Sequence, residues 1–150
     1  MEHEKITSTS IVKPHWIFWC VSALALFWNS FGALDYFMTQ TKNTAWMSNF
    51  SPELLEYVYS FPAWAIAGWA VGVWGGVAGA LLMFFKSRFA FTLFMLSFIG
   101  LIFNTIYMDG LSNGMEIMGG SSVLIRGAIF IFAALLCLYS KRMQLKGVLR

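Results

Sequence analysis

Four long stretches of apolar residues, separated by short polar segments, dominate the pattern of the chain. They cover residues 16–36, 63–85, 89–108 and 122–140. A helix needs ~20 predominantly apolar residues to cross a bilayer, and each stretch suits such a span. The pattern therefore predicts an all-α protein in which residues 1–150 form a single integral membrane domain, a four-helix transmembrane bundle.

The polar segments between the spans carry one further helix signal. Ser51, Pro52 and Glu53 combine a helix cap, a proline suited to the first helical position and an acid in the first turn. The apolar face that follows consists of Leu54, Leu55, Val58 and Tyr59. We therefore expect a short amphipathic interfacial helix in the loop between the first two spans, ending before the next proline. Residues 39–49 and 111–121 are expected to be loops.

Composition and charge agree with a membrane location. Hydrophobic residues make up 59% of the chain and charged residues 11%, whereas the apolar share of soluble domains is ~45–50%. The tails and the turn at residues 86–88 hold most of the lysines and arginines, whereas the loops on the opposite side hold Lys42 alone. Short cytoplasmic loops retain positive charge, so we expect both the N and C termini in the cytoplasm. The net charge of +3 then reflects orientation in the lipid bilayer, the expected partner, and gives no reason to invoke nucleic acid.

The second span carries a stripe of small residues that recurs every four positions. The stripe consists of Gly68, Gly72, Gly76 and Ala80. Small residues let a second helix approach closely, which gives van der Waals contact that lipid tails cannot match. The stripe therefore predicts helix packing, either against another helix of this chain or, in a homo-oligomer, against the same helix of a second copy.

Arg126 is a charge inside the last span, where it costs about 2.5–3.5 kcal/mol and tends to face the protein interior. Asp35 and Asp109 end two other spans on the same side of the membrane. From the rise of a helix, ~1.5 Å per residue, Asn29 and Asn104 are expected at the level of Arg126. The predicted outward-facing pocket is lined by Asn29, Asp35, Asn104, Asp109 and Arg126, with Trp28 and Tyr107 as apolar walls. Such a pocket suits a polar small-molecule ligand and predicts binding or transport of a polar solute.

The same polar residues have a simpler interpretation, in which a salt bridge and hydrogen bonds only hold the bundle together. The alternative function is therefore a non-transporting accessory or structural membrane protein. The chain carries no hydrolase, metalloprotease or phosphate-loop motif, so no catalytic residues are assigned and no enzyme activity is expected. His3 and His15 are distant from each other, and Cys20 and Cys137 form no Cys-x-x-Cys pair, so no metal or cofactor is expected.

Four motifs along the chain also carry a resemblance to a known family. They are Trp28-Asn29-x-x-Gly32-x-x-Asp35-Tyr36-x-Met38-Thr39-Gln40, Phe61-Pro62-Ala63-Trp64, Val73-Trp74-Gly75-Gly76 and Gly110-Leu111-Ser112-Asn113-Gly114. In these motifs the chain resembles a family of small four-helix bacterial inner-membrane proteins that are labelled sugar transporters. The resemblance implies a multi-pass protein of the bacterial inner (plasma) membrane and a sugar-like solute.

Overall fold

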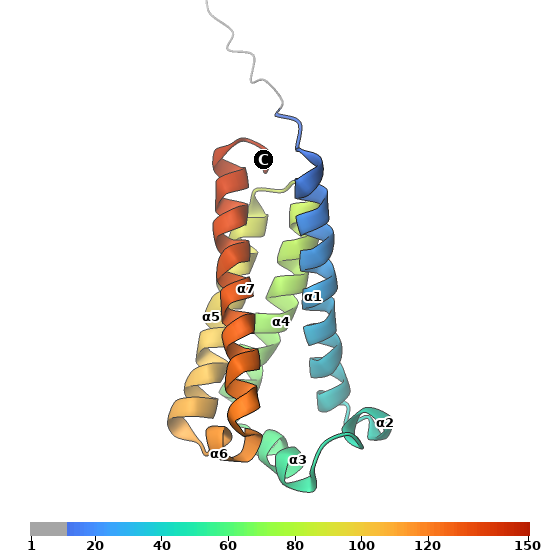
Figure 1. The fold of residues 1–150 in the computed structure, drawn as a ribbon, viewed down its shortest axis with the longest axis vertical. Coiled ribbons are helices and arrows are strands. Elements are labelled where there is room, and N and C mark those ends of the chain that lie inside the picture. Colours follow the sequence, from blue (N-terminus) through green and yellow to red (C-terminus); the bar gives the residue numbers. More distant parts are fainter. Residues whose placement is uncertain (1–11) are drawn as a thin grey trace, which may run out of the picture.

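The computed structural model describes residues 12–150, and this part of the chain is built around four long helices (Figure 1). These are α1 (Trp16–Gln40), α4 (Ala63–Phe84), α5 (Phe89–Thr105) and α7 (Gly120–Leu145). A π-helical turn, η1 (Ile106–Leu111), continues α5. With α5 and η1 taken together, all four are long and apolar enough to cross a membrane. The predicted all-α four-helix bundle is confirmed.

Two of the long helices extend beyond the predicted spans. The predicted first span ends at residue 36, whereas α1 continues to Gln40, and the predicted last span ends at residue 140, whereas α7 continues to Leu145. A drop in hydropathy does not by itself end a helix, because polar residues can keep the backbone hydrogen bonds. The chain leaves α1 only at Lys42, whose φ of 51° lies in the left-handed region. The extension changes the depth at which the polar residues of α1 lie.

Three short helices connect the long ones at the end of the bundle away from the α4–α5 turn (Figure 1). They are α2 (Thr44–Met47), α3 (Pro52–Tyr59) and α6 (Gly114–Met118). α3 is the predicted interfacial helix, and the Ser51 hydroxyl caps it by accepting a hydrogen bond from the Leu54 N–H at 3.2 Å. Its buried face differs from the prediction, because Tyr57 is buried and Tyr59 is exposed. Tyr57 follows Leu54 by three residues and so shares its face of the helix. α2 and α6 replace parts of the two predicted loops.

The long helices pack in the order α1, α4, α5, α7, each mainly against its neighbours in that series. α1 and α7, at the two ends of the series, are not among the closely packed pairs. The rings of Trp28 and Phe132 bridge these two helices, with centroids 5.0 Å apart. One side of the bundle, between α1 and α7, is therefore loosely packed.

The small-residue stripe of α4 packs against α5 of the same chain. A methyl group added at Gly68 would lie 3.2 Å from the Gly100 carbonyl oxygen, and one at Gly72 would lie 3.5 Å from the α5 backbone. The other two members of the stripe, Gly76 and Ala80, are buried. Because helices of the same chain cover the stripe, it is not free to pair with a second copy. The homo-oligomer stays a prediction, without an assigned face.

The C-terminal residues close the end of the bundle that holds the α4–α5 turn. Gly147, with φ 72°, turns the chain back, and Val148 and Leu149 are buried in the hydrophobic core. The N–H and C=O groups of Arg150 both hydrogen-bond to the backbone of the α4–α5 turn, at 2.9 and 3.1 Å. The C-terminal residues therefore close this end of the bundle. The sequence pattern did not predict this closure.

Shortening one of these side chains tests the seal. We expect Leu149→Ala to lower the free energy of unfolding by about 2 kcal/mol, because it empties a buried site. Leu149 is 2% exposed, whereas Leu145, on the last turn of α7, is 77% exposed. Leu145→Ala is the matched control and should change stability by less than about 0.5 kcal/mol. Thermal unfolding in detergent micelles measures both, and equal effects would mean that the C-terminal segment is not docked.

Candidate functional site

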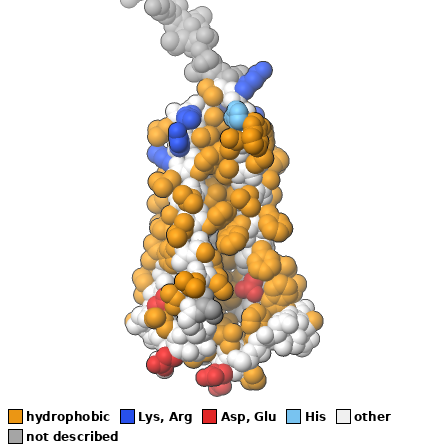
Figure 2. All heavy atoms as spheres, viewed as in Figure 1, with side chains coloured by type: hydrophobic (Ala, Val, Ile, Leu, Met, Phe, Trp, Pro, Cys, Tyr) orange, Lys and Arg blue, Asp and Glu red, His pale blue; other side chains and the backbone are white. Residues whose placement is uncertain are grey.

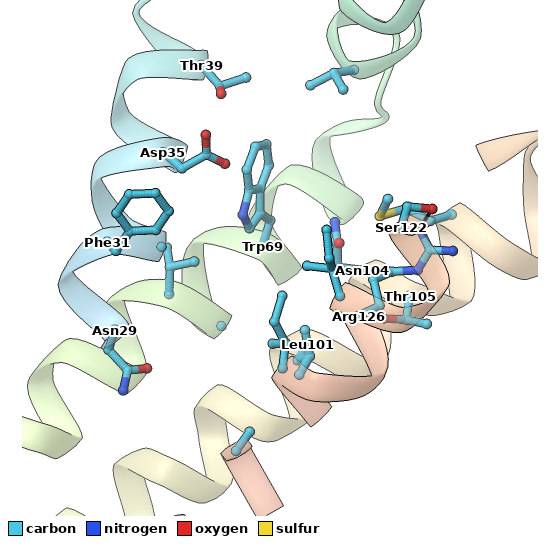
Figure 3. Close-up of a pocket in the computed structure, with 18 of the residues that line it drawn as sticks. Asn29, Phe31, Asp35, Thr39, Trp69, Leu101, Asn104, Thr105, Ser122 and Arg126 are labelled. Carbon is cyan, nitrogen blue, oxygen red and sulfur yellow. Dashed lines mark hydrogen bonds between the residues drawn. The ribbon is translucent and has the colours of Figure 1, made fainter. Parts of the chain in front are cut away.

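A cavity of about 510 Å³ lies between the four long helices and extends beneath α3 (Figure 3). On α7 its lining runs from Ser122 to Leu136, about 21 Å along the helix axis. Phe31 of α1 and Ile125 of α7 both line it and are exposed. Because α1 and α7 are also the loosely packed pair, the cavity opens between them. Figure 2 shows a hollow on this face of the molecule, in the lower half of the view.

The lining of the cavity is mostly apolar, with a small number of polar side chains. These are Asn29, Asp35, Thr39, Ser97, Asn104, Thr105, Ser122 and Arg126. Most of them lie at the end near α3, whereas the opposite end is closed by Phe94, Phe132, Ala133 and Leu136. The cavity is therefore elongated and asymmetric, polar at one end and apolar at the other.

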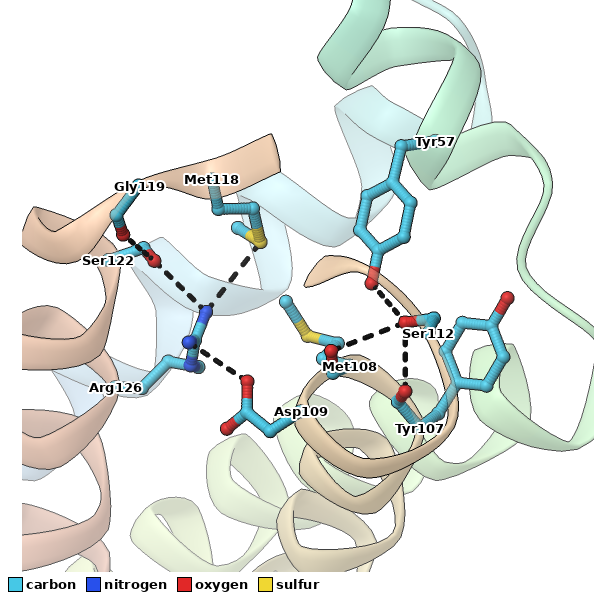
Figure 4. A network of polar contacts seen from close by, with 9 residues as sticks. All are labelled: Tyr57, Tyr107, Met108, Asp109, Ser112, Met118, Gly119, Ser122 and Arg126. Carbon is cyan, nitrogen blue, oxygen red and sulfur yellow. Dashed lines mark hydrogen bonds and ion pairs between the residues drawn. The ribbon is translucent and has the colours of Figure 1, made fainter. Parts of the chain in front are cut away.

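Arg126 lies on α7 at the polar end, and its guanidinium is paired with Asp109 of η1 (Figure 4). Nη2 lies 2.9 Å from Asp109 Oδ1, although it makes no well-aligned hydrogen bond. Nη1 donates to Ser122 Oγ at 3.2 Å and approaches the Met118 sulfur at 3.7 Å. The Arg126 side chain is 12% exposed and that of Asp109 is 32% exposed. The charge inside the last span is thus neutralised by one of the carboxylates that the sequence placed near it.

A pair of hydroxyl groups lies next to the π-helical turn that carries Asp109. Ser112 Oγ lies 2.9 Å from the Tyr107 carbonyl oxygen and donates to it, and its oxygen is 2.6 Å from the Tyr57 hydroxyl. Since the single Ser112 hydrogen is used on the carbonyl, the Tyr57 hydroxyl is the donor. Burial raises the pKa of Tyr57 above its ordinary value, with Asp109 among the lesser causes, so the phenol stays protonated in this role. The pairing of the two hydroxyls is not visible in the sequence, because Tyr57 and Ser112 lie far apart in the chain.

Asp35 does not join the Arg126 pair. Its Oδ1 accepts a hydrogen bond from the Trp46 indole N–H at 3.0 Å, and its side chain lines the cavity from the α1 wall. Among the residues that the structure describes, Asp35 has no ion-pair partner. The expected meeting of three charges is therefore only partly found, since Asp109 and Arg126 pair and Asp35 stands apart from them.

The two asparagines lie at different depths, and the prediction of a common level is wrong. Asn29 donates to the Ala25 carbonyl at 2.7 Å and lies against Gly76 of α4. Asn104 donates to the Ala65 carbonyl of α4 at 3.4 Å and lies near Gly68. Gly68 and Gly76 are about 12 Å apart along α4. Because α1 runs past the predicted end of the first span, Asn29 lies deeper than a helix ending at residue 36 would place it. Figure 3 shows the two side chains well separated.

Trp28 and Tyr107, the predicted apolar walls, have different places. Trp28 lines the cavity and packs on Phe132. Tyr107 is not among the lining residues and instead packs edge-on against Phe61 and Trp64, with ring centroids 5.0 and 5.5 Å apart. Asp109 is also outside the lining, behind Arg126. Trp69 of α4 lines the cavity without having been predicted.

Within residues 12–150, no three histidine, cysteine or acidic side chains gather as a metal site would require. The polar end instead holds an ion pair, a separate carboxylate, amides and hydroxyls.

The protein is thus a helical bundle with four helices able to cross a membrane, and it encloses an elongated and mostly apolar cavity with one polar end. Comparison with models of known protein families, with curated proteins and with solved structures finds no match.

Proposed function

We propose that this is a small multi-pass membrane protein that binds an elongated amphipathic small molecule in the cavity between its helices. The observation that carries the proposal is the asymmetric lining of the cavity. One end is apolar, at Phe94 and Leu136, and the other end is polar, at Asp35 and Arg126. The opening between α1 and α7 would face lipid in a membrane. An amphipathic molecule dissolved in the bilayer would enter through it without crossing water.

A sugar, as implied by the family resemblance, fits this lining less well. Each hydroxyl that leaves water without a hydrogen-bond partner costs about 1–3 kcal/mol in a protein. The few polar groups of the cavity are partly used by the protein itself, since Arg126 is paired with Asp109 and Asn104 with the Ala65 carbonyl. A molecule with one polar end and an apolar body meets both parts of the lining. We therefore propose an amphiphile in place of the polar solute that the sequence predicts, and its head group is the part that meets the polar side chains.

Under this proposal both termini face the cytoplasm of a bacterial inner membrane. The charge distribution supports this orientation, because on the face in Figure 2 basic side chains lie at the upper end and acidic ones in the lower half. Short cytoplasmic loops retain lysine and arginine. The polar end of the cavity then lies in the periplasmic half of the membrane.

A second candidate function, an accessory or structural membrane protein, is favoured by one observation. The Arg126–Asp109 pair ties α7 to η1, and the Asn104 amide ties α5 to α4. Polar contacts of this kind hold helices together whether or not a ligand binds. This candidate requires no occupant of the cavity, so the two functions differ in whether a molecule is bound.

Native mass spectrometry of gently extracted protein separates the two. We expect a co-purifying amphipathic molecule, and we expect Ala133→Phe to weaken its affinity about tenfold, equivalent to ~1.4 kcal/mol, by filling the apolar end. Ala133 lines the cavity, whereas Ala128, also on α7, is exposed and does not. Ala128→Phe is the matched control and should keep the bound molecule. A protein that carries no small molecule under any extraction condition would favour the accessory function.

A further inference from the structure

The charges at the polar end of the cavity do not balance. Within the described part of the chain, two charged side chains line it, Asp35 and Arg126. Arg126 is already neutralised by Asp109 at 2.9 Å. Asp35 accepts a hydrogen bond only from the neutral indole of Trp46, and no cation among the described residues pairs with it. The three groups together leave one negative charge without a counter-charge beside a mostly apolar space.

Aromatic side chains lie near this carboxylate (Figure 3). Phe31 and Trp69 line the cavity on the same side as Asp35, and Figure 3 shows the Asp35 carboxyl group next to the Trp69 indole, across the cavity from Arg126. Tyr36 packs edge-on against Trp69, with ring centroids 5.1 Å apart and an interplanar angle of 89°, which fixes the indole. Phe50 also lines this end. A carboxylate beside aromatic faces is the combination that binds organic ammonium groups, because each ring face attracts a cation.

From this arrangement we infer that the ligand is a cationic amphiphile, whose ammonium head lies between the Asp35 carboxylate and the rings of Phe31 and Trp69. This inference rests on the proposed function, since it names the class of ligand for the same cavity. The apolar body of the ligand extends toward Phe94 and Leu136.

The other two kinds of head group fit the charges less well. An anionic head would have to compete with Asp109 for Arg126 and would meet the repulsion of both Asp109 and Asp35. A neutral head would leave the Asp35 carboxylate without a counter-charge at membrane depth, which is unfavourable. A cation removes the imbalance with no rearrangement of the Arg126–Asp109 pair.

Three probes with the same alkyl chain test the head group directly: dodecyltrimethylammonium, dodecan-1-ol and dodecanoate. Their binding to the full-length protein in lipid nanodiscs is measured by native mass spectrometry, with empty nanodiscs as the reference for partitioning into lipid. We expect the cation to bind about tenfold or more tightly than the alcohol, and the anion to bind most weakly.

The variants assign the preference to one residue. Asp35→Asn keeps the size of the side chain and an acceptor for Trp46, and it should abolish the preference for the cation. Asp35→Glu restores the charge and should restore the preference. Glu56→Gln is the matched control, because Glu56 is an exposed acid of α3 outside the lining, and it should behave as the wild type.

The outcomes distinguish this inference from the proposed function. If the alcohol binds as tightly as the cation, or if Asp35→Asn keeps the preference, the cationic ligand is overturned while amphiphile binding stands. A preference for dodecanoate also overturns the cationic ligand, and it would indicate that the head group binds Arg126. If none of the three probes binds, the proposed function fails as well. Should Asp35→Asn not fold, the ranking of the probes on the wild type and on Asp35→Glu decides.

Discussion

Replacing Gly100 with alanine is expected to destabilise the protein by about 3 kcal/mol, at the upper end of the usual cost of overpacking a core. The added methyl group would lie 2.6 Å from the Gly68 carbonyl oxygen and 2.6 Å from the Gly72 backbone nitrogen. Both atoms belong to the backbone of α4, so no side chain can rotate away, and α4 and α5 must separate. Thermal or denaturant unfolding in detergent micelles measures the loss.

The same substitution in an open position is the control for Gly100→Ala. Gly127 lies on α7, and a methyl group added there meets no atom within 4 Å. Alanine is the better helix former by ~1 kcal/mol, so Gly127→Ala should be neutral or slightly stabilising. Gly72→Ala should have an intermediate effect, because its nearest contact is 3.5 Å away. If Gly100→Ala and Gly127→Ala proved equally mild, the close approach of α4 and α5 would be wrong.

Removing the anion of the ion pair should have an effect of similar size. We expect Asp109→Asn to lower the free energy of unfolding by about 3 kcal/mol, because it leaves the guanidinium buried without a counter-charge. Arg126 is 12% exposed, whereas Asp109 is 32% exposed. The reverse substitution, Arg126→Leu, should therefore cost less, since water can reach the carboxylate that remains.

The double variant tests whether the two charges act on each other. Replacing a buried ion pair by uncharged groups is often close to neutral, so Arg126→Leu combined with Asp109→Asn should recover most of the loss caused by Asp109→Asn. Glu116→Gln removes an exposed acid of the neighbouring α6 and should leave stability nearly unchanged. Additive effects of the two single variants would show that the two charges do not stabilise each other. That result would contradict a structural role for the Arg126–Asp109 pair.

Much of the fold follows from local properties of the chain. A bilayer requires long apolar helices, and that requirement is visible in hydropathy alone, which is why the four spans were predicted within a few residues at most ends. The start of α3 was also predicted, because the Ser51 cap and Pro52 act within one helical turn. The small-residue stripe of α4 indicated close packing for the same reason, since its spacing is a property of one helix.

Which helix packs against that stripe is not a local property of the chain. Ser97, Gly100 and Asn104 recur at spacings of three and four in the span of residues 89–108, and they form the complementary face of α5. This spacing was the available signal for α4–α5 packing. Without the fold, however, nothing in it distinguishes a partner in the same chain from one in a second copy.

Three features are readable from the residues alone: four apolar helices, a short capped helix and a set of polar residues that a membrane span does not tolerate without a reason. The fold was needed to show that Arg126 pairs with Asp109, that Asp35 lines the cavity without a counter-charge, and that Asn29 lies deeper than Asn104. A sequence pattern sets the length and the faces of each single helix. The relative translation and packing of helices, which select the contacts between them, depend on where each helix ends and on side chains distant in the chain.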